Sequence, residues 1–168
     1  MFIHNLVTAL SDANIPYCIV GGVAVNLYGV QRRTYNVDVV VALDTKTLAS
    51  LGRTLEALGL RPRSRVRLTD FSDPVLRRRL LIERNLFKIE YFDPERPVRE
   101  VDIILSPPLR ASELIRRAVQ LPMAGTAVRI AALNDLIFIK RVSGRLHDAD
   151  DAARLEQLRR LRRRRSSP

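Results

Sequence analysis

The sequence has almost no cysteine and no long hydrophobic run. Cys18 is the only cysteine among 168 residues, which excludes a disulfide framework and a zinc site built on cysteines. The apolar segment 2–10 has no basic residue before it and is interrupted by Asn5, so it fits neither a signal peptide nor a membrane span. The later apolar runs are shorter still. These absences predict a protein of the reducing cytoplasm with no membrane contact.

Internal repeats and the common glycine-rich phosphate motifs are also missing. Neither GxGxxG nor GxxxxGK[ST] occurs, and the arginine-rich end is the only low-complexity segment. A chain of this length can bury a core without covalent staples. We expect a single domain over residues 1–160, mixed α/β to about residue 106 and mostly helical from about residue 107. A disordered basic tail is expected over residues 161–168.

The net charge of +11 is unevenly distributed. Six arginines lie in the last ten residues, and without them the net charge is only +5. Such a segment is typical of a contact with RNA or another polyphosphate, but also of a solvated helix end. The segment 61–67 presents the same choice: its four arginines at alternate positions share one face if the segment is extended.

Hydrophobic spacing, together with glycine and proline positions, predicts the order of the elements. Strands are expected over residues 17–20, 36–43, 86–92, 98–105 and 127–130, with a turn at 93–97 that makes a hairpin. Helices are expected over residues 2–13, 23–28, 45–58, 74–84, 110–119, 133–142 and 148–163. This order predicts an α/β (α+β) fold with a mixed sheet and a helical C-terminal half.

A glycine pair follows the first expected strand. Gly21 and Gly22 allow the backbone to approach a ligand closely, and the helix that they open offers N–H groups and a positive dipole end to a phosphate. Taken alone, the pair is better explained as a tight turn and nothing more.

Two acidic residues interrupt strands that are otherwise apolar. Asp38 shares a strand face with Asn36, and Asp102 shares one with Glu100. A buried carboxylate requires an arginine, backbone donors or a metal ion as its partner. A structural ion pair would explain either acid alone. Two such acids after a glycine turn predict carboxylates that converge on a hard cation such as Mg²⁺.

Together these residues resemble the signature of the polymerase-β-like nucleotidyltransferase superfamily. Residues 20–22 provide its hydrophobic–Gly–Gly element, and after thirteen residues the segment 36–39 stands where the family has acid–hydrophobic–acid. Arg33 and Thr34 resemble the Arg-x-Thr lead-in, shortened by one residue. Asp102 matches the third acid of the family.

The C-terminal half resembles a subset of this superfamily. The segments 133–140 and 144–151 are similar to two helices of small stand-alone members related to the AbiEii-type toxins of toxin–antitoxin systems. Lys140, Arg145 and Asp148 match the lysine, arginine and aspartate of that pattern. The resemblance covers about residues 14–158.

The resemblance implies transfer of a nucleoside monophosphate from an NTP such as ATP to a hydroxyl acceptor, dependent on Mg²⁺ (or Mn²⁺). The acceptor would be RNA, a protein or a small molecule, and a toxin-like role would bring an antitoxin or another protein partner. Catalysis and metal binding are assigned by resemblance to Asp38 and Asp102, with Asn36 as a weak ligand. Nucleotide contact is assigned to Gly21, Gly22, Arg33, Thr34, Lys140, Arg145 and Asp148.

Asn36 departs from the family pattern, which has an acid at this position. An amide keeps an oxygen that can act as a ligand but loses the negative charge that bridges two cations. The site is naturally degenerate, or carries a deliberate Asp→Asn substitution, or needs only one metal ion. Two other functions therefore remain open: a catalytically silent nucleotidyltransferase fold that binds a nucleotide or a partner, and a basic RNA-binding module whose acids pair with arginines.

Overall fold

The first elements run from a helix through a buried strand into the glycine turn. The computed structural model describes residues 2–123 and 125–166. Helix α1 (Phe2–Asp12) buries Leu6, Val7 and Leu10, the apolar side chains at helical spacing. Strand β1 (Tyr17–Val20) is buried throughout, and helix α2 (Gly21–Leu27) starts directly at its end, two residues earlier than predicted.

Aspartate caps define two of the next helices. Strand β2 (Asn36–Val41) is followed by α3 (Thr45–Ala57), where the Asp44 side chain accepts a hydrogen bond from the Thr47 N–H at 2.9 Å. Helix α4 (Pro74–Glu83) is capped in the same way by Asp73, with Pro74 in its first turn, as the sequence predicts. Between them lie strand β3 (Arg61–Pro62) and the short 3-10 helix η1 (Leu68–Ser72).

The predicted hairpin is confirmed, and it supplies one side of the candidate site. Strands β4 (Lys88–Phe92) and β5 (Glu100–Ile104) pair antiparallel, with Glu90 opposite Asp102. In the turn between them, the Asp93 side chain accepts hydrogen bonds from the backbone N–H groups of Glu95 and Arg96.

The C-terminal half adds two strands and three helices. Its elements are α5 (Ala111–Arg117), β6 (Val119–Met123), β7 (Thr126–Ile130), α6 (Leu133–Val142) and α7 (Leu146–Ser166). No strand was expected at β6, whose Pro122 would be disfavoured in a central strand. β6 lies at the edge of the sheet, where a missing N–H donor is tolerated.

The strand order β3-β4-β5-β2-β1-β7-β6 makes one mixed sheet and confirms the α/β fold class. Parallel pairing of β2 with β5 sets Asp38 opposite Asp102. Antiparallel pairing of β1 with β2 sets Val20 opposite Asp38, so the chain reaches Gly21 next to this acid. The sheet topology therefore joins three parts of the sequence pattern at one place.

Two arginine-rich segments differ from the sequence expectation. Only Arg61 and Pro62 of the segment 61–67 are in a strand, and Arg63 folds over the Phe92 ring at 4.3 Å, so the four arginines do not form one extended row. Helix α7 continues to Ser166, although disorder was expected from residue 161. Leucine and arginine favour helices, and the Arg162 guanidinium lies 5.4 Å from the Tyr28 ring. The last two residues of the predicted tail lie outside the described residues.

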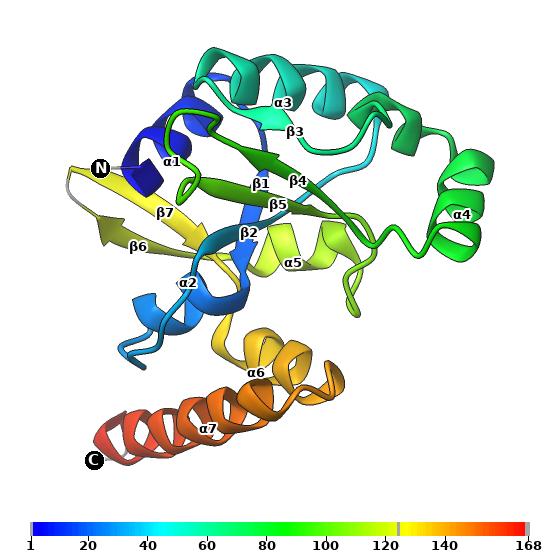
Figure 1. The fold of residues 1–168 in the computed structure, drawn as a ribbon. Coiled ribbons are helices and arrows are strands. Elements are labelled where there is room, and N and C mark those ends of the chain that lie inside the picture. The colour runs from blue at the N-terminus through cyan, green and yellow to red at the C-terminus, as the bar shows by residue number, and fades with distance from the viewer. Residues whose placement is uncertain (1, 124, 167–168) are drawn as a thin grey trace.

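Helices α6 and α7 pack together as a pair beside the sheet (Figure 1), and α6 also contacts α2. The long α7 rod runs below the glycine turn, at the opposite end of the molecule from α1 and α3. Across residues 2–123 and 125–166, every helix is either too short or too polar to traverse a lipid bilayer.

Candidate functional site

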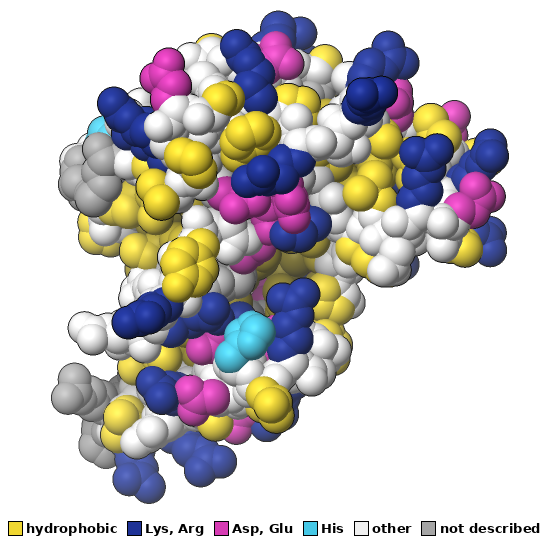
Figure 2. Space-filling model, viewed as in Figure 1, with side chains coloured by type: hydrophobic (Ala, Val, Ile, Leu, Met, Phe, Trp, Pro, Cys, Tyr) yellow, Lys and Arg dark blue, Asp and Glu magenta, His cyan; other side chains and the backbone are white. Residues whose placement is uncertain are grey.

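A cleft of about 500 Å³ lies between the sheet and the α6–α7 pair. The space-filling view shows this hollow, with acidic and basic side chains gathered around it (Figure 2). One wall consists of the α2 glycine turn and side chains of β2, β4 and β5, and the other carries residues of α6 and the start of α7. Of the predicted site residues, the lining includes Gly21, Gly22, Thr34, Asn36, Asp38, Asp102, Lys140, Arg145 and Asp148.

Both glycines are required by close contacts within the site. Gly21 has a φ of +64°, and a Cβ there would lie 1.8 Å from Asp38 Oδ2. A Cβ on Gly22 would lie 2.6 Å from Thr34 Oγ1. An L side chain at Gly21 would therefore combine backbone strain with displacement of the Asp38 carboxylate. The glycine turn and the acidic strand are one structural unit.

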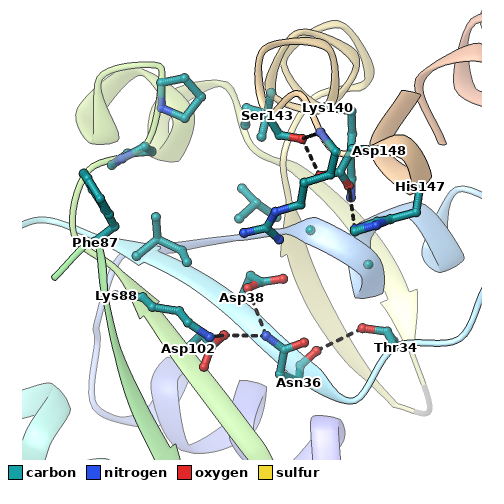
Figure 3. A pocket seen from close by; sticks show the side chains of 18 of the residues that line it. Thr34, Asn36, Asp38, Phe87, Lys88, Asp102, Lys140, Ser143, His147 and Asp148 are labelled. Carbon is teal, nitrogen blue, oxygen red and sulfur yellow. Dashed lines mark hydrogen bonds and ion pairs between the residues drawn. The ribbon is translucent and has the colours of Figure 1, made fainter. Parts of the chain in front are cut away.

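The Asn36 amide lies between the two acids (Figure 3). Its Nδ2 donates hydrogen bonds to Asp38 Oδ1 at 3.1 Å and to Asp102 Oδ2 at 2.5 Å. Its backbone carbonyl accepts a hydrogen bond from Thr34 Oγ1 at 3.3 Å. A neutral donor thus connects two carboxylates that would otherwise repel each other.

Asp38 has a strongly perturbed carboxyl group. Burial raises its pKa to about 6, and the negative charge of Asp102 adds to the increase, while Lys140, Lys88 and Arg145 oppose it. The protonated and ionised forms of Asp38 are therefore both accessible near neutral pH. A cluster of this kind in a cleft is typical of functional sites.

Two acids that the sequence analysis did not assign to the site, Glu90 and Glu100, complete the acidic wall together with Asp102. Glu90, Glu100 and Asp102 bring carboxylate oxygens within 4.8 Å of one another. The Lys88 ammonium lies 2.7 Å from Glu90 Oε1 and 2.7 Å from Asp102 Oδ2. Burial opposes the charged form of Lys88, but the hydrogen bonds to Asp102 and Glu90 give a net increase in its pKa.

The donor set fits a hard divalent cation. Asp102 is 1% exposed, and its Oδ1 has no hydrogen-bond partner among the described residues. A buried carboxylate oxygen without a partner is costly, so it favours binding of an external cation or donor. Asp38 and Asp102 provide the hard oxygens that Mg²⁺ prefers, whereas Asn36 turns its Nδ2, a donor, toward them.

On the opposite wall, a buried network joins α6 to α7. Lys140 is 5% exposed; its ammonium forms ion pairs with Asp148 and, at 2.9 Å, with Asp151. Ser143 Oγ donates a hydrogen bond to Asp148, and Arg32 pairs with Asp151 at 2.6 Å. Burial opposes ionisation of Asp148, but hydrogen bonds from Lys140 and Ser143 lower its pKa. Lys140 and Asp148 are thus primarily partners of each other.

Arg33 is the predicted site residue that the structure does not bring into the cleft. Its side chain is exposed, and the neighbouring Arg32 lines the cleft instead. The Asn26 side chain fixes this loop: its Oδ1 accepts from the Arg32 N–H at 2.8 Å, and its Nδ2 donates to the Arg32 carbonyl at 3.0 Å. Residues 32–34 read Arg-Arg-Thr, so Arg32 rather than Arg33 is the arginine of an Arg-x-Thr triplet that lines the cleft with Thr34.

Pairing explains which residues the sequence analysis missed. Glu90 and Lys88 alternate along β4, and only the hairpin register shows that Glu90 faces Asp102. The turn at 93–97 limits the possible registers of the hairpin but does not fix one. A shift of one residue would move both side chains to the other face of the sheet. In the sequence, Asp151 is one of several acids near the start of a helix, and nothing there indicates its ion pairs with Arg32 and Lys140.

Comparisons with known proteins identify the fold. No protein-family model matches the sequence, and no curated protein matches it significantly. The structure is similar to ANT(2'')-Ia in complex with adenylyl-2''-tobramycin, at 16% identity over 98% of this chain and 97% of that one, with a TM-score of 0.57. It is also similar to the lincosamide antibiotic adenylyltransferase LnuA, lincomycin-bound, at 13% identity over 93% and 95% of the chains and a TM-score of 0.60.

A third similar structure is an antigenic nucleotidyltransferase-like protein from Paracoccidioides brasiliensis. It is 20% identical over 95% of this chain and 75% of that one, with a TM-score of 0.59. The chain therefore has the fold of nucleotidyltransferases, as predicted. At these identities the likeness does not extend to the AbiEii-type subset or to a substrate.

Proposed function

We propose that this protein is a nucleotidyltransferase that moves a nucleoside monophosphate from an NTP to a hydroxyl acceptor. The observation that carries the proposal is the packing of the Gly21 turn against Asp38, in register with Asp102, inside one cleft. Basic residues of the opposite wall, Lys140 and Arg145, face this acidic strand pair across the cleft. The fold shared with adenylyltransferases supports the same activity.

The residues divide the work by charge and position. Gly21 and Gly22 line the cleft with backbone alone, and the side chains of Thr34 and Arg32 lie beside Gly22. Arg145 supplies positive charge to the triphosphate, while Lys140 and Asp148 hold the α6–α7 pair in place. Asp38 and Asp102 would hold Mg²⁺ or Mn²⁺, which when bound stabilises negative charge on the phosphoryl oxygens.

The proposed reaction is a displacement at the α-phosphorus of the NTP. The acceptor oxygen forms a bond to this phosphorus, the bond to the β-phosphate oxygen breaks, and pyrophosphate leaves. The proton of the acceptor hydroxyl passes to a carboxylate of the cleft.

The acceptor and the biological role remain parts of the proposal. RNA, a protein side chain and a small molecule each present a hydroxyl group, and a toxin-like cytoplasmic role with an antitoxin partner comes from the sequence resemblance alone. ANT(2'')-Ia and LnuA are described with tobramycin and lincomycin products or ligands, which favours testing small-molecule acceptors first.

Label transfer tests the activity. The chain and its Asn36→Asp variant are incubated with α-³²P-labelled NTPs, Mg²⁺ and separate acceptor pools of RNA, protein and hydroxylated small molecules. We expect transfer to one pool, at least tenfold faster in Asn36→Asp because a third negative charge strengthens ion binding. The Asp38→Ala variant is the control and should show no transfer. The proposal would be refuted if neither the parent chain nor Asn36→Asp transferred label or bound Mg²⁺–NTP.

A silent binding protein is the second candidate, and Asn36 is the observation that favours it. The amide donates a hydrogen bond to each acid without an ion, which reduces the repulsion between the two carboxylates in the ion-free cleft. This function predicts NTP binding by the parent chain without any transfer, and transfer only after Asn36→Asp. The same experiment therefore separates the two candidates.

A further inference from the structure

The acidic wall of the cleft contains more negative charge than Asp38 and Asp102 alone. Glu90, Glu100 and Asp102 project from paired strands β4 and β5, with carboxylate oxygens within 4.8 Å of one another. Three such carboxylates are a suitable oxygen set for a divalent cation. Asp102 belongs to this cluster and also lies beside Asp38, so the cluster is continuous with the proposed catalytic site.

A lysine already lies inside this carboxylate cluster. The Lys88 Nζ is 2.7 Å from Glu90 Oε1 and 2.7 Å from Asp102 Oδ2, and Figure 3 shows its side chain extending to Asp102. The same Oδ2 accepts the Asn36 amide at 2.5 Å. Arg63 lies 3.6 Å from Glu90 and 3.5 Å from Glu100. Protein cations thus neutralise the outer carboxylates.

The two oxygens of Asp102 differ in their surroundings. Oδ2 is occupied by Lys88 and Asn36, whereas Oδ1 is buried and has no partner among the described residues. One oxygen is therefore committed to the protein's own donors, and the other is left for an external ligand. A site for two ions would need more carboxylate oxygens of Asp38 and Asp102 to be free of protein donors.

We propose that the Lys88 ammonium is the resident cation of the Glu90–Glu100–Asp102 cluster and, with the Asn36 amide, takes the place of one divalent ion. Resting on the proposed nucleotidyl transfer, the inference is that the cleft works with a single divalent ion that arrives with the NTP. Lys88 is here a positioning residue, because it acts through Asp102 rather than on the reacting atoms. The inference explains the amide at position 36, because a site for one ion does not need a third carboxylate there.

Divalent-ion binding in the absence of nucleotide tests the role of Lys88 directly. Mn²⁺ is titrated into the parent chain, Lys88→Gln, Lys88→Arg and the exposed control Lys46→Gln, and free Mn²⁺ is followed by electron paramagnetic resonance. We expect Lys88→Gln to gain one Mn²⁺ site at least tenfold tighter than the parent. Lys88→Arg and Lys46→Gln should bind Mn²⁺ as the parent does, because the former keeps the charge and the latter lies on α3.

The parent titration keeps the inference falsifiable even if Lys88→Gln folds poorly by circular dichroism. Tight Mn²⁺ binding by the nucleotide-free parent would refute a resident lysine cation. So would a folded Lys88→Gln variant whose Mn²⁺ affinity equals that of the parent.

A second titration separates this inference from the proposed function. With a non-hydrolysable NTP analogue present, we expect one Mn²⁺ per complex in the parent and two in the Asn36→Asp, Lys88→Gln double variant. Two ions in the parent would refute the one-ion site. Failure of the analogue to bind at all would refute the proposed function, while the nucleotide-free result for Lys88 would still stand.

Discussion

At the scale of single residues, Asp38 lies in an environment that opposes its own charge. It is placed beside Asp102 by the β2–β5 register and pressed against Gly21 by the turn. Its raised pKa means that folding favours the protonated carboxyl group. Natural sites accept such a cost where function requires it, so this acid should lower stability at the pH at which it works.

Replacing Asp38 should therefore change how stability depends on pH. The folded pKa of about 6 exceeds the unfolded value of about 3.9, so between these values the folded state holds a proton that the unfolded chain has released. The contribution of Asp38 to stability is therefore highest below about pH 4 and falls by about 3 kcal/mol as the pH rises through 6. Asp38→Asn should remove this fall. Thermal unfolding in a chelating buffer from pH 4 to pH 8 measures it.

The control for this experiment is Asp12→Asn, at an exposed carboxyl group near the end of α1. We expect its unfolding profile to follow that of the parent chain. Parallel profiles for Asp38→Asn and the parent would show that Asp38 is not buried against Asp102 as described.

At the scale of elements, α6 and α7 are joined by buried charge as well as by apolar packing. Lys140, Asp148 and Asp151 form a network in which each side chain is at most 6% exposed. Arg32 connects the same network to the loop before β2. The helix pair is thus coupled to the strand that carries Asn36 and Asp38.

Removing the central cation should weaken this junction strongly. Lys140→Met leaves Asp148 and Asp151 with fewer partners in a buried setting, and we expect a loss of about 3 kcal/mol of unfolding free energy. The matched control is Arg154→Met, which breaks the exposed Arg154–Asp150 pair of α7 and should cost less than about 1 kcal/mol. Urea denaturation of both variants gives the comparison. Equal losses would contradict a buried network.

Elements were easier to predict from the sequence than their partners. Breakers and caps such as Pro16, Asp73 and the 93–97 turn act locally, so the helices and the hairpin were predicted close to their observed bounds. Strand β6 was missed because its place at the sheet edge, which tolerates Pro122, is a tertiary property. Lys88 and Glu90 were missed for the same reason, since their meaning depends on what lies across the hairpin.

At the scale of the whole molecule, positive charge is concentrated at the C-terminal end of α7. The helix carries six arginines from Arg159 to Arg165, along a rod that lies apart from the sheet (Figure 1). The cleft itself contains acids and bases in mixture. Substitutions on α7 should therefore change the attraction of a polyanion without changing nucleotide binding in the cleft.

Charge removal at two sites tests this separation. Arg160→Gln with Arg164→Gln and the control pair Arg53→Gln with Arg84→Gln change the net charge equally, all at exposed arginines. We expect only the α7 pair to reduce the salt dependence of binding to single-stranded RNA, by about 0.7 in log–log slope for each lost phosphate contact. Fluorescence anisotropy between 50 and 300 mM salt measures it. Equal slopes for both pairs would assign the RNA attraction to net charge alone.

The amide of Asn36 has a thermodynamic consequence beyond the reaction. With an acid at this position, three ionised groups would meet in the empty cleft, and folding would become linked to the ion: stability would rise as RT ln(1 + [Mg²⁺]/Kd). Because Asn36 donates to both Asp38 and Asp102, the folded state needs no ion to offset their repulsion. Folding therefore does not require a supply of divalent metal, although any ion that binds the cleft still adds to the stability of the folded state.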